Sequence, residues 1–218
     1  DLFGSDHAAT FPDVLAGVKA LGYDDTKIKV LIHQFVTIME GGEIVKMSTR
    51  KANYITLDEL VGEVGSDVVR YFFNMRSISS HMNFDLTLAK KQSDDNPVFY
   101  LQYAHARICS IIKTVKEEKL KSSIDNLYLL TTEEEQRLLK KLHLFEEEIL
   151  FSAENFEPHR ICIYLEELAV AFHKFYHLHR ILGSEKKLAE ARLALAVATK
   201  IVIKNGLEIL GVSAPERM

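Results

Sequence analysis

A short basic segment carries the most specific chemistry in this sequence. Lys46-Met47-Ser48-Thr49-Arg50 follows a stretch rich in Val, Ile, Leu and Phe. Cations on a short loop can close over a triphosphate and stabilise the charge that develops during transfer at the α-phosphate, while Ser48 and the backbone donate hydrogen bonds. The same residues could form an exposed basic turn, so the surrounding sequence must decide between the two interpretations.

A second candidate site lies on the helix predicted from Asn96 to about Leu120. Tyr100, Tyr103 and Arg107 follow one another at i, i+3 and i+7, which places them on one flank of that helix. Phenol rings stack on unpaired bases, and an Arg binds phosphate or a base edge. The alternative is that both tyrosines cover the rim of a core formed by the neighbouring apolar stripe, which comprises Leu101, Ala104, Ile108, Ile111, Ile112 and Val115.

The helix predicted over residues 159–180 also has an apolar side and a polar face. Its apolar side comprises Ile161, Leu165, Leu168, Phe172 and Phe175, and another face comprises Glu166, His173, His177 and Arg180. The two histidines have the i, i+4 spacing of metal ligands, but the sequence offers them neither a third ligand nor a helper glutamate motif. Histidines at the surface or facing RNA are therefore favoured over a metal site.

These residues need a mostly helical framework. The sequence predicts a helix over 11–20, a strand over 28–39 and a hairpin turn at Gly41-Gly42. The helix signals after residue 56 are the capping-box spacing of Thr56 to Glu59, Ser66 as a cap, Asn96-Pro97, a second capping box at Thr132 and Glu135, Pro158, and Ser184 before a last helix that stops near Gly211. We therefore expect a mainly α fold, a helix bundle preceded by a small α/β remnant.

Composition and charge exclude some classes of function. The chain has 218 residues with 27 Lys and Arg against 31 Asp and Glu, a formal net charge of −4 that excludes a uniformly basic nucleic-acid binder. Charge is nevertheless segregated: residues 133–157 carry −5 and residues 159–204 carry +4, which predicts a local basic face unless both are ordinary solvated helix faces. Cys109 and Cys162 lack paired spacing, which indicates a reducing compartment, and no apolar run reaches the roughly 18 residues of a membrane span.

Longer stretches of similarity to a known family decide how the basic segment at residues 46–50 is interpreted. Residues 45–60 resemble the KMSKS-loop region of bacterial arginyl-tRNA synthetases, although Thr49 stands where that motif has its second Lys. Residues 65–72 resemble the G-A-D-A-x-R-F/Y-F segment of the family, residues 81–86 its H-L-D-F-D-L segment, and residues 96–107 its N-P-V-Y-Y-V-Q-Y-A-H-A-R signature. Residues 211–218 match the terminal G-V-x-x-P-E-R-M. These ordered matches span essentially the whole chain.

The resemblance implies a class I synthetase that activates arginine with Mg-ATP and transfers it to arginine tRNA. Residues 1–56 would be the C-terminal part of a Rossmann catalytic domain, residues 57–95 connecting helices, and residues 96–218 a helical DALR anticodon-binding domain. Because the sequence contains no H-I-G-H motif, we expect this part alone to be inactive. The resemblance also implies a cytoplasmic monomer with no membrane partner and no structural metal.

The same resemblance assigns residues to roles. Catalytic positions would be Lys46, Met47, Ser48 and Arg50, and the ATP and substrate site would use Gly4, Asp6, His7, Lys46 and Ser48. The tRNA-binding set would be Tyr100, Tyr103, Arg107, His173, Tyr176 and Met218. Two other classes stay open: a stand-alone RNA-binding or regulatory module, and a helical protein-interaction domain.

Overall fold

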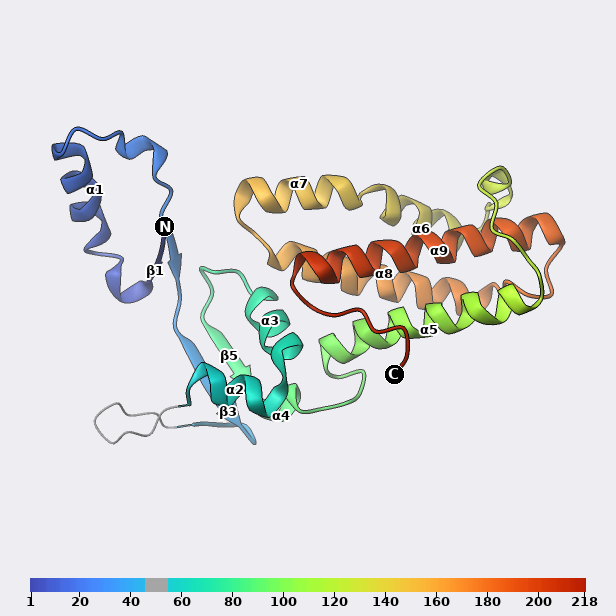
Figure 1. Cartoon of the computed structure of the whole chain (residues 1–218), viewed down its shortest axis with the longest axis horizontal. Coiled ribbons are helices and arrows are strands. Elements are labelled where there is room, and N and C mark those ends of the chain that lie inside the picture. Colours follow the sequence, from blue (N-terminus) through green and yellow to red (C-terminus); the bar gives the residue numbers. More distant parts are fainter. Residues whose placement is uncertain (46–54) are drawn as a thin grey trace. The chain divides into compact units, whose positions relative to one another are not determined.

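The computed structural model of the chain describes residues 1–45 and 55–218. They form two compact units, one comprising residues 1–56 and 76–89 and the other residues 57–75 and 90–218. Helices dominate and the strands are short, so the mainly α fold class is confirmed (Figure 1). Among the described residues, none of the helices combines the length and the apolar character that crossing a membrane requires.

The first unit begins with a βαβ arrangement. Strand β1 (Leu2–Gly4) pairs in parallel with β2 (Leu31–His33), with Leu2 opposite Leu31 and Gly4 opposite His33. Parallel neighbours need a crossover connection, and here it contains helix α1 (Phe11–Ala20), which confirms the helix predicted over 11–20. The carboxyl ends of β1 and β2 therefore lie side by side.

The stretch predicted as one strand over 28–39 is divided between two sheets. After β2, strand β3 (Val36–Glu40) pairs in parallel with β5 (Met82–Asp85), which continues directly into the short helix α4 (Leu86–Ala89). The prediction of a single strand was wrong because pairing partners distant in sequence decide where a strand ends. The hairpin is confirmed: β3 pairs with β4 (Glu43–Ile44) across Gly41 and Gly42, both at positive φ, as a two-residue hairpin turn requires.

The second unit is a helix bundle. Its helices are α2 (Leu57–Val64), α3 (Ser66–Asn74), α5 (Pro97–Glu117), α6 (Glu133–His143), α7 (Phe145–Asn155), α8 (His159–Leu178) and α9 (Lys186–Ile209). The predicted Asn96 cap is confirmed, since its side chain accepts the Val98 N–H at 3.1 Å, and so is the Thr132 capping box. The predicted Ser66 cap was wrong, because Gly65 occupies the cap position and Ser66 is already helical.

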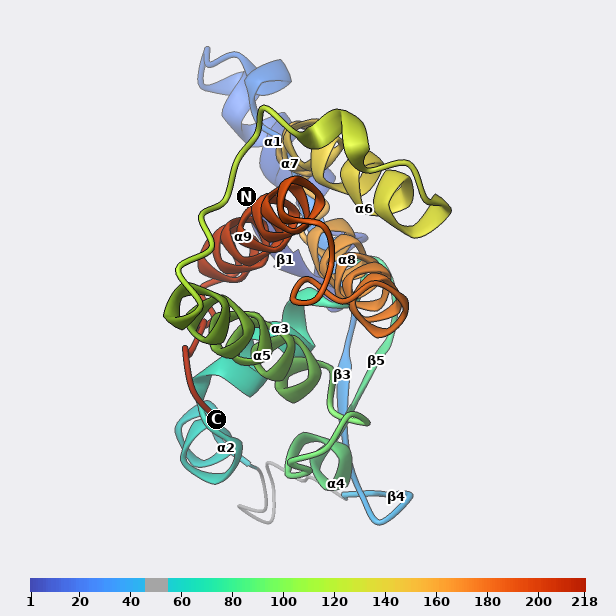
Figure 2. The same ribbon diagram turned by 90° about the vertical axis from the view of Figure 1, so that its right-hand side faces the viewer.

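The core of this unit lies between α5, α8 and α9, which Figure 2 shows nearly end-on. Every residue of the two predicted apolar stripes on α5 and α8 is buried, so both stripes are confirmed. Gly206 of α9 faces Leu165 of α8, where an added Cβ would lie 2.6 Å from the leucine Cδ2. A glycine at this position therefore allows the two helices to approach closely.

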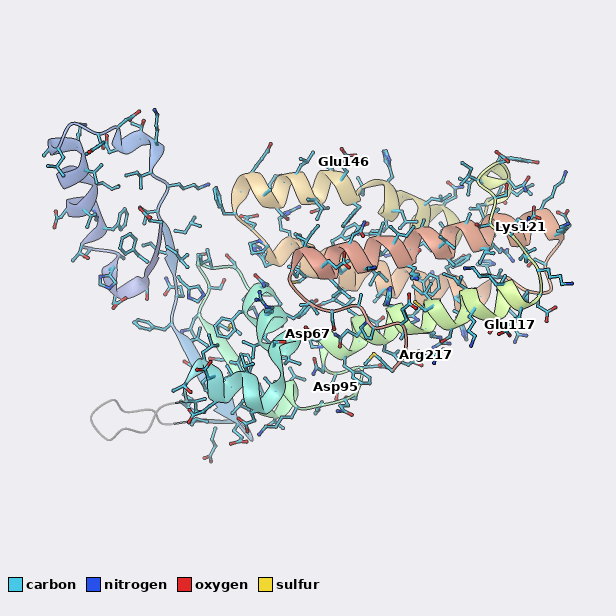
Figure 3. The ribbon with its side chains drawn as sticks, in the orientation of Figure 1. Asp67, Asp95, Glu117, Lys121, Glu146 and Arg217 are labelled. Atoms are coloured by element: carbon cyan, nitrogen blue, oxygen red, sulfur yellow. The ribbon has the colours of Figure 1, made fainter. Side chains whose placement is uncertain are left out.

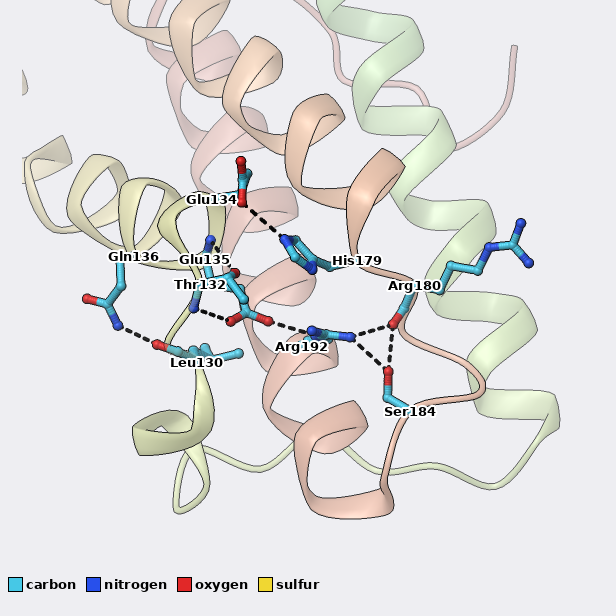
Figure 4. A network of polar contacts seen from close by, with 9 residues as sticks. All are labelled: Leu130, Thr132, Glu134, Glu135, Gln136, His179, Arg180, Ser184 and Arg192. Carbon is cyan, nitrogen blue, oxygen red and sulfur yellow. Dashed lines mark hydrogen bonds and ion pairs between the residues drawn. The ribbon is translucent and has the colours of Figure 1, made fainter.

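A buried ion pair ties α6 to α9. Arg192 Nε donates to Glu135 Oε1 at 2.7 Å, and the Arg192 and Glu135 side chains are only 10% and 1% exposed (Figure 4). The second carboxylate oxygen of Glu135 accepts the Thr132 N–H at 3.0 Å. Burying two charges is costly unless their remaining hydrogen bonds are made. Here both oxygens of the Glu135 carboxylate accept a hydrogen bond.

The same arginine fixes the connection between α8 and α9. Arg192 Nη1 donates to the Arg180 carbonyl at 3.0 Å and to Ser184 Oγ at 2.8 Å. Glu134, next to Glu135, contacts His179 Nε2 at 3.1 Å and Lys174 Nζ at 3.2 Å. These contacts lower the pKa of Glu134 to about 2, with the His179 hydrogen bond the largest cause. The C-terminal end of α8 is thus held by polar contacts with α6 and α9.

We expect Glu135→Gln to destabilise the bundle by about 3–5 kcal/mol, because it leaves the Arg192 charge buried without its counter-ion. Chemical denaturation followed by circular dichroism measures the change in the free energy of unfolding. Glu133→Gln is the matched control, since Glu133 is exposed in the same helical turn. Equal stability of the two variants would contradict a structural role for the pair.

Candidate nucleic-acid interface

A groove of about 1020 Å³ lies between α5 and α8 in the second unit. It brings together five residues of the predicted tRNA-binding set: Tyr100, Tyr103, Arg107, His173 and Tyr176. Its other lining residues are Asp94, Ser110, Ile111, Thr114, Val115, Lys174, His177, Arg180, Ile181 and Leu182. The sequence analysis missed Ser110 and Thr114, although they continue the helical flank of Arg107 at i+3 and i+7.

Aromatic rings gather where α5 begins. The Tyr100 and His173 rings lie 5.6 Å apart, which joins the two walls of the groove. Tyr103 lies parallel to Phe99 with an interplanar angle of 3°, and Tyr176 lies parallel to Phe172 with an angle of 8°. Since Tyr103 is 38% exposed and its ring plane is supported by Phe99, it presents a preorganised surface on which a planar ring can stack.

The groove is mainly cationic. Its lining includes the cations Arg107, Lys174 and Arg180, and Asp94 is the one acidic residue among the described residues that line it. The pKa of His173 is lowered, first by burial and then by the charge of Arg107, so the imidazole is neutral at pH 7. A neutral imidazole offers one N–H donor and one nitrogen acceptor. Burial raises the pKa of Tyr100, which keeps its hydroxyl protonated.

Glu166 does not join the groove. Its carboxylate accepts a hydrogen bond from the buried Tyr71 hydroxyl of α3 at 2.7 Å, so it belongs to the packing of α3 against α8. His173 and His177 both line the groove. Within the part of the chain that the structure describes, no three potential ligands lie close enough together to hold a metal ion.

The C-terminal tail, residues 212–218, is bound to α5 by side chains that the sequence analysis did not single out. Gln102 Nε2 donates to the Ser213 carbonyl at 3.0 Å and to Asp67 Oδ2 at 2.8 Å. The fully buried His105 donates from Nδ1 to the Pro215 carbonyl at 2.8 Å. Figure 3 labels Asp67 at the start of α3 and Arg217 in the tail.

Met218, the sixth residue of the predicted set, ends this tail and is 56% exposed. It is absent from the described lining of the groove. Figure 2 shows the tail passing α5 on the side away from α8. Tyr103 and Met218 therefore lie on different flanks of α5, and only an RNA that reaches around the helix can contact both.

The predicted ATP-site residues of the first unit follow β1. Gly4 ends the strand, and Ser5–His7 form one turn of 3-10 helix in which His7 Nε2 lies 3.6 Å from Asp6 Oδ2. Ligands of parallel sheets bind outside the carboxyl ends of the strands, which is where Gly4, Asp6 and His7 lie. The predicted catalytic positions Lys46, Met47, Ser48 and Arg50 fall outside the described residues.

Comparisons with known proteins agree on one family. Residues 101–218 match the family model of the DALR anticodon binding domain. Over its whole length the chain is 52% identical to an arginine–tRNA ligase of Salinibacter ruber and 49% identical to one of Desulfotalea psychrophila, and it spans 39% and 40% of the length of these relatives.

Solved structures give the same result for the fold. A crystal structure of a candidate arginyl-tRNA synthetase from Campylobacter jejuni matches the whole chain with a TM-score of 0.86 at 28% identity, and the match covers 47% of that protein. The arginyl-tRNA synthetase of Thermus thermophilus matches the whole chain with a TM-score of 0.77 at 24% identity, which supports the fold alone, and the match covers 40% of that protein.

We expect His105→Leu to release the tail, because it removes the N–H that holds the Pro215 carbonyl. Amide hydrogen exchange of residues 212–218 should rise about 2- to 10-fold, the range for one net hydrogen bond. His105→Asn retains an N–H donor and should have a smaller effect. Unchanged exchange in both variants would show that other contacts hold the tail.

The hydrogen bond between His105 and Pro215 also predicts that the stability of the bundle depends on pH. Burial lowers the pKa of His105 below its usual 6.5, so protonation favours the unfolded state. The contribution of this site to stability is therefore complete above pH 6.5 and is lost as the pH falls below it. Unfolding midpoints of the wild type and of His105→Leu should accordingly differ more at pH 7.5 than at pH 5.

Proposed function

The chain belongs to the DALR anticodon-binding domain family, and from this premise we propose that it is the C-terminal portion of an arginine–tRNA ligase. In this proposal the bundle binds the anticodon loop of arginine tRNA in the groove between α5 and α8. The observation that carries the proposal is the gathering of aromatic rings and cations from two helices in one groove. The high identity to arginine–tRNA ligases over the whole chain supports it.

The groove is suited to a splayed, single-stranded RNA loop. Unstacked bases stack on aromatic rings, and Tyr103 is exposed with its ring held parallel to Phe99. Arg107 and Arg180 would bind backbone phosphates, since Arg and Lys supply the salt-dependent part of RNA affinity, whereas the Lys174 ammonium is already paired with Glu134. The neutral imidazole of His173 can donate one hydrogen bond to a base edge and accept another. The tail with Met218 would contact the tRNA from the other flank of α5.

The intact protein would activate arginine with ATP and transfer it to tRNA in the cytoplasm. Lys46 and Arg50 would stabilise negative charge at the α-phosphate in the transition state, Ser48 would donate a hydrogen bond, and Met47 would complete the loop. Gly4, Asp6 and His7 would border the nucleotide at the end of β1. Mg²⁺ would arrive with the triphosphate and neutralise part of its charge. Because the catalytic steps need the remaining part of the longer protein, this chain alone should not support ATP–pyrophosphate exchange.

We expect Tyr103→Ala to weaken binding of arginine tRNA to this chain by about 1–3 kcal/mol, the range for losing one stack of a base on an aromatic ring. Fluorescence anisotropy at fixed salt measures the affinity. Tyr103→Phe should bind normally because it keeps the ring. Tyr128→Ala is the control for loss of an exposed tyrosine, since Tyr128 is 70% exposed and lies outside the groove.

Two results would count against an anticodon site in the groove. One is normal affinity of Tyr103→Ala, and the other is lost affinity accompanied by an equal loss of thermal stability, which would make Tyr103 a packing residue only. Either result would remove the groove as the anticodon site, whereas failure of the wild-type chain to bind arginine tRNA would overturn the proposed function.

In the intact ligase, Lys46→Ala should lower kcat for aminoacylation about 10²-fold or more if its charge meets the transition state. Steady-state kinetics with varied ATP measure the effect, and Lys27→Ala is the control because Lys27 is an exposed lysine of the same unit. An unchanged kcat with a raised KM for ATP would instead assign Lys46 to ground-state binding.

A further inference from the structure

The C-terminal tail is held in place by polar contacts more than by apolar packing. Val212 is the one buried residue of the tail. Beyond it the chain is attached at three points within four residues: Ser213 and Pro215 are bound by α5, and Glu216 Oε1 lies 3.2 Å from Lys200 Nζ of α9. These attachments fix the path of a segment that buries little apolar surface.

The attachment at Ser213 joins three elements of the bundle. The amide of Gln102, on α5, donates from Nε2 to the Ser213 carbonyl at 3.0 Å and to Asp67 Oδ2 of α3 at 2.8 Å. The Ser213 hydroxyl donates to the same carboxylate oxygen. Both neighbours of the Gln102 amide nitrogen are thereby occupied, so the half-buried side chain has one defined orientation, and the tail has one defined position beside α5.

The attachments end just before two residues that remain available for a ligand. Arg217 and Met218 are exposed, and their side chains make neither a hydrogen bond nor an ion pair with another described residue. A guanidinium binds phosphate, and the flexible thioether of a methionine packs against a planar ring. A tail that is fixed as far as Glu216 therefore presents both side chains from a defined point on the surface.

We infer that Gln102 is a positioning residue for the contact of Arg217 and Met218 with RNA. The inference rests on the proposed RNA-binding function and names the residue that prepares the tail for it. A segment that must be ordered on binding lowers the affinity, whereas a segment ordered beforehand does not. Loss of the Gln102 amide should therefore weaken RNA binding although every atom that contacts the RNA is retained.

The test is a double-mutant cycle in which fluorescence anisotropy measures the affinity for arginine tRNA at one salt concentration. Gln102→Leu is compared with the wild type, and the same comparison is made in a chain that ends at Glu216. In the full-length chain Gln102→Leu should weaken binding about 2- to 10-fold, the range for one net hydrogen bond. In the shortened chain it should leave the affinity unchanged, because the residues that it positions are gone.

Tyr103→Ala is the control for the cycle. Tyr103 lies on the other flank of α5, so its substitution should have the same effect on affinity in both chain lengths. Ser213→Ala is a second variant, which removes a hydroxyl of the tail and leaves α5 unaltered. Its effect should likewise depend on residues 217–218. Thermal unfolding is measured for every variant.

Two results would overturn the inference while RNA binding stands. One is an equal loss of affinity for Gln102→Leu in both chain lengths, which would make Gln102 a residue that only supports the packing of α3 on α5. The other is an unchanged affinity of the shortened chain, which would show that the tail does not contact the RNA. If the wild type does not bind arginine tRNA, the proposed function fails and the inference fails with it.

Discussion

The bundle depends on one buried charge pair. Glu135 and Arg192 are 57 residues apart in sequence, and their contact joins α6, α9 and the segment after α8. Buried ion pairs contribute little net stability, but they tolerate few alternative arrangements because an unpaired buried charge is very costly. Arg192 also binds the Arg180 carbonyl, and Glu134, the neighbour of Glu135, binds Lys174, so two residues of the groove wall are tied to α6 and α9.

Helix α5 makes three different kinds of contact on three of its sides. Its apolar stripe packs into the core, the flank with Tyr100, Tyr103 and Arg107 forms one wall of the groove, and Gln102 with His105 binds the tail. The 3.6-residue period separates these sides by only one or two positions in sequence. A substitution on α5 can therefore affect the core, the wall of the groove or the position of the tail according to its register, and each variant needs a stability measurement beside its binding measurement.

Much of this arrangement could be predicted from sequence because it is local. The Asn96 cap, the Thr132 capping box and the apolar stripes each depend on residues within one helix, and all are confirmed. The division of residues 28–39 between two sheets could not be predicted, because it depends on pairing with residues 2–4 and 82–85. The partners of Arg192 and His105 are likewise distant in sequence. The contacts of Lys46 to Arg50 and of Met218 with substrates stay predictions.

The most direct test of the RNA-binding account is hydrogen–deuterium exchange of the chain with and without arginine tRNA. The account predicts protection on binding at the two walls of the groove, in residues 97–107 and 173–182, with smaller changes in the tail. A second groove, lined by Phe145, Leu150 and Ile209 among others, serves as the internal reference and should not change. Protection confined to residues 145–150 and 205–209, or none at saturating tRNA, would contradict the account.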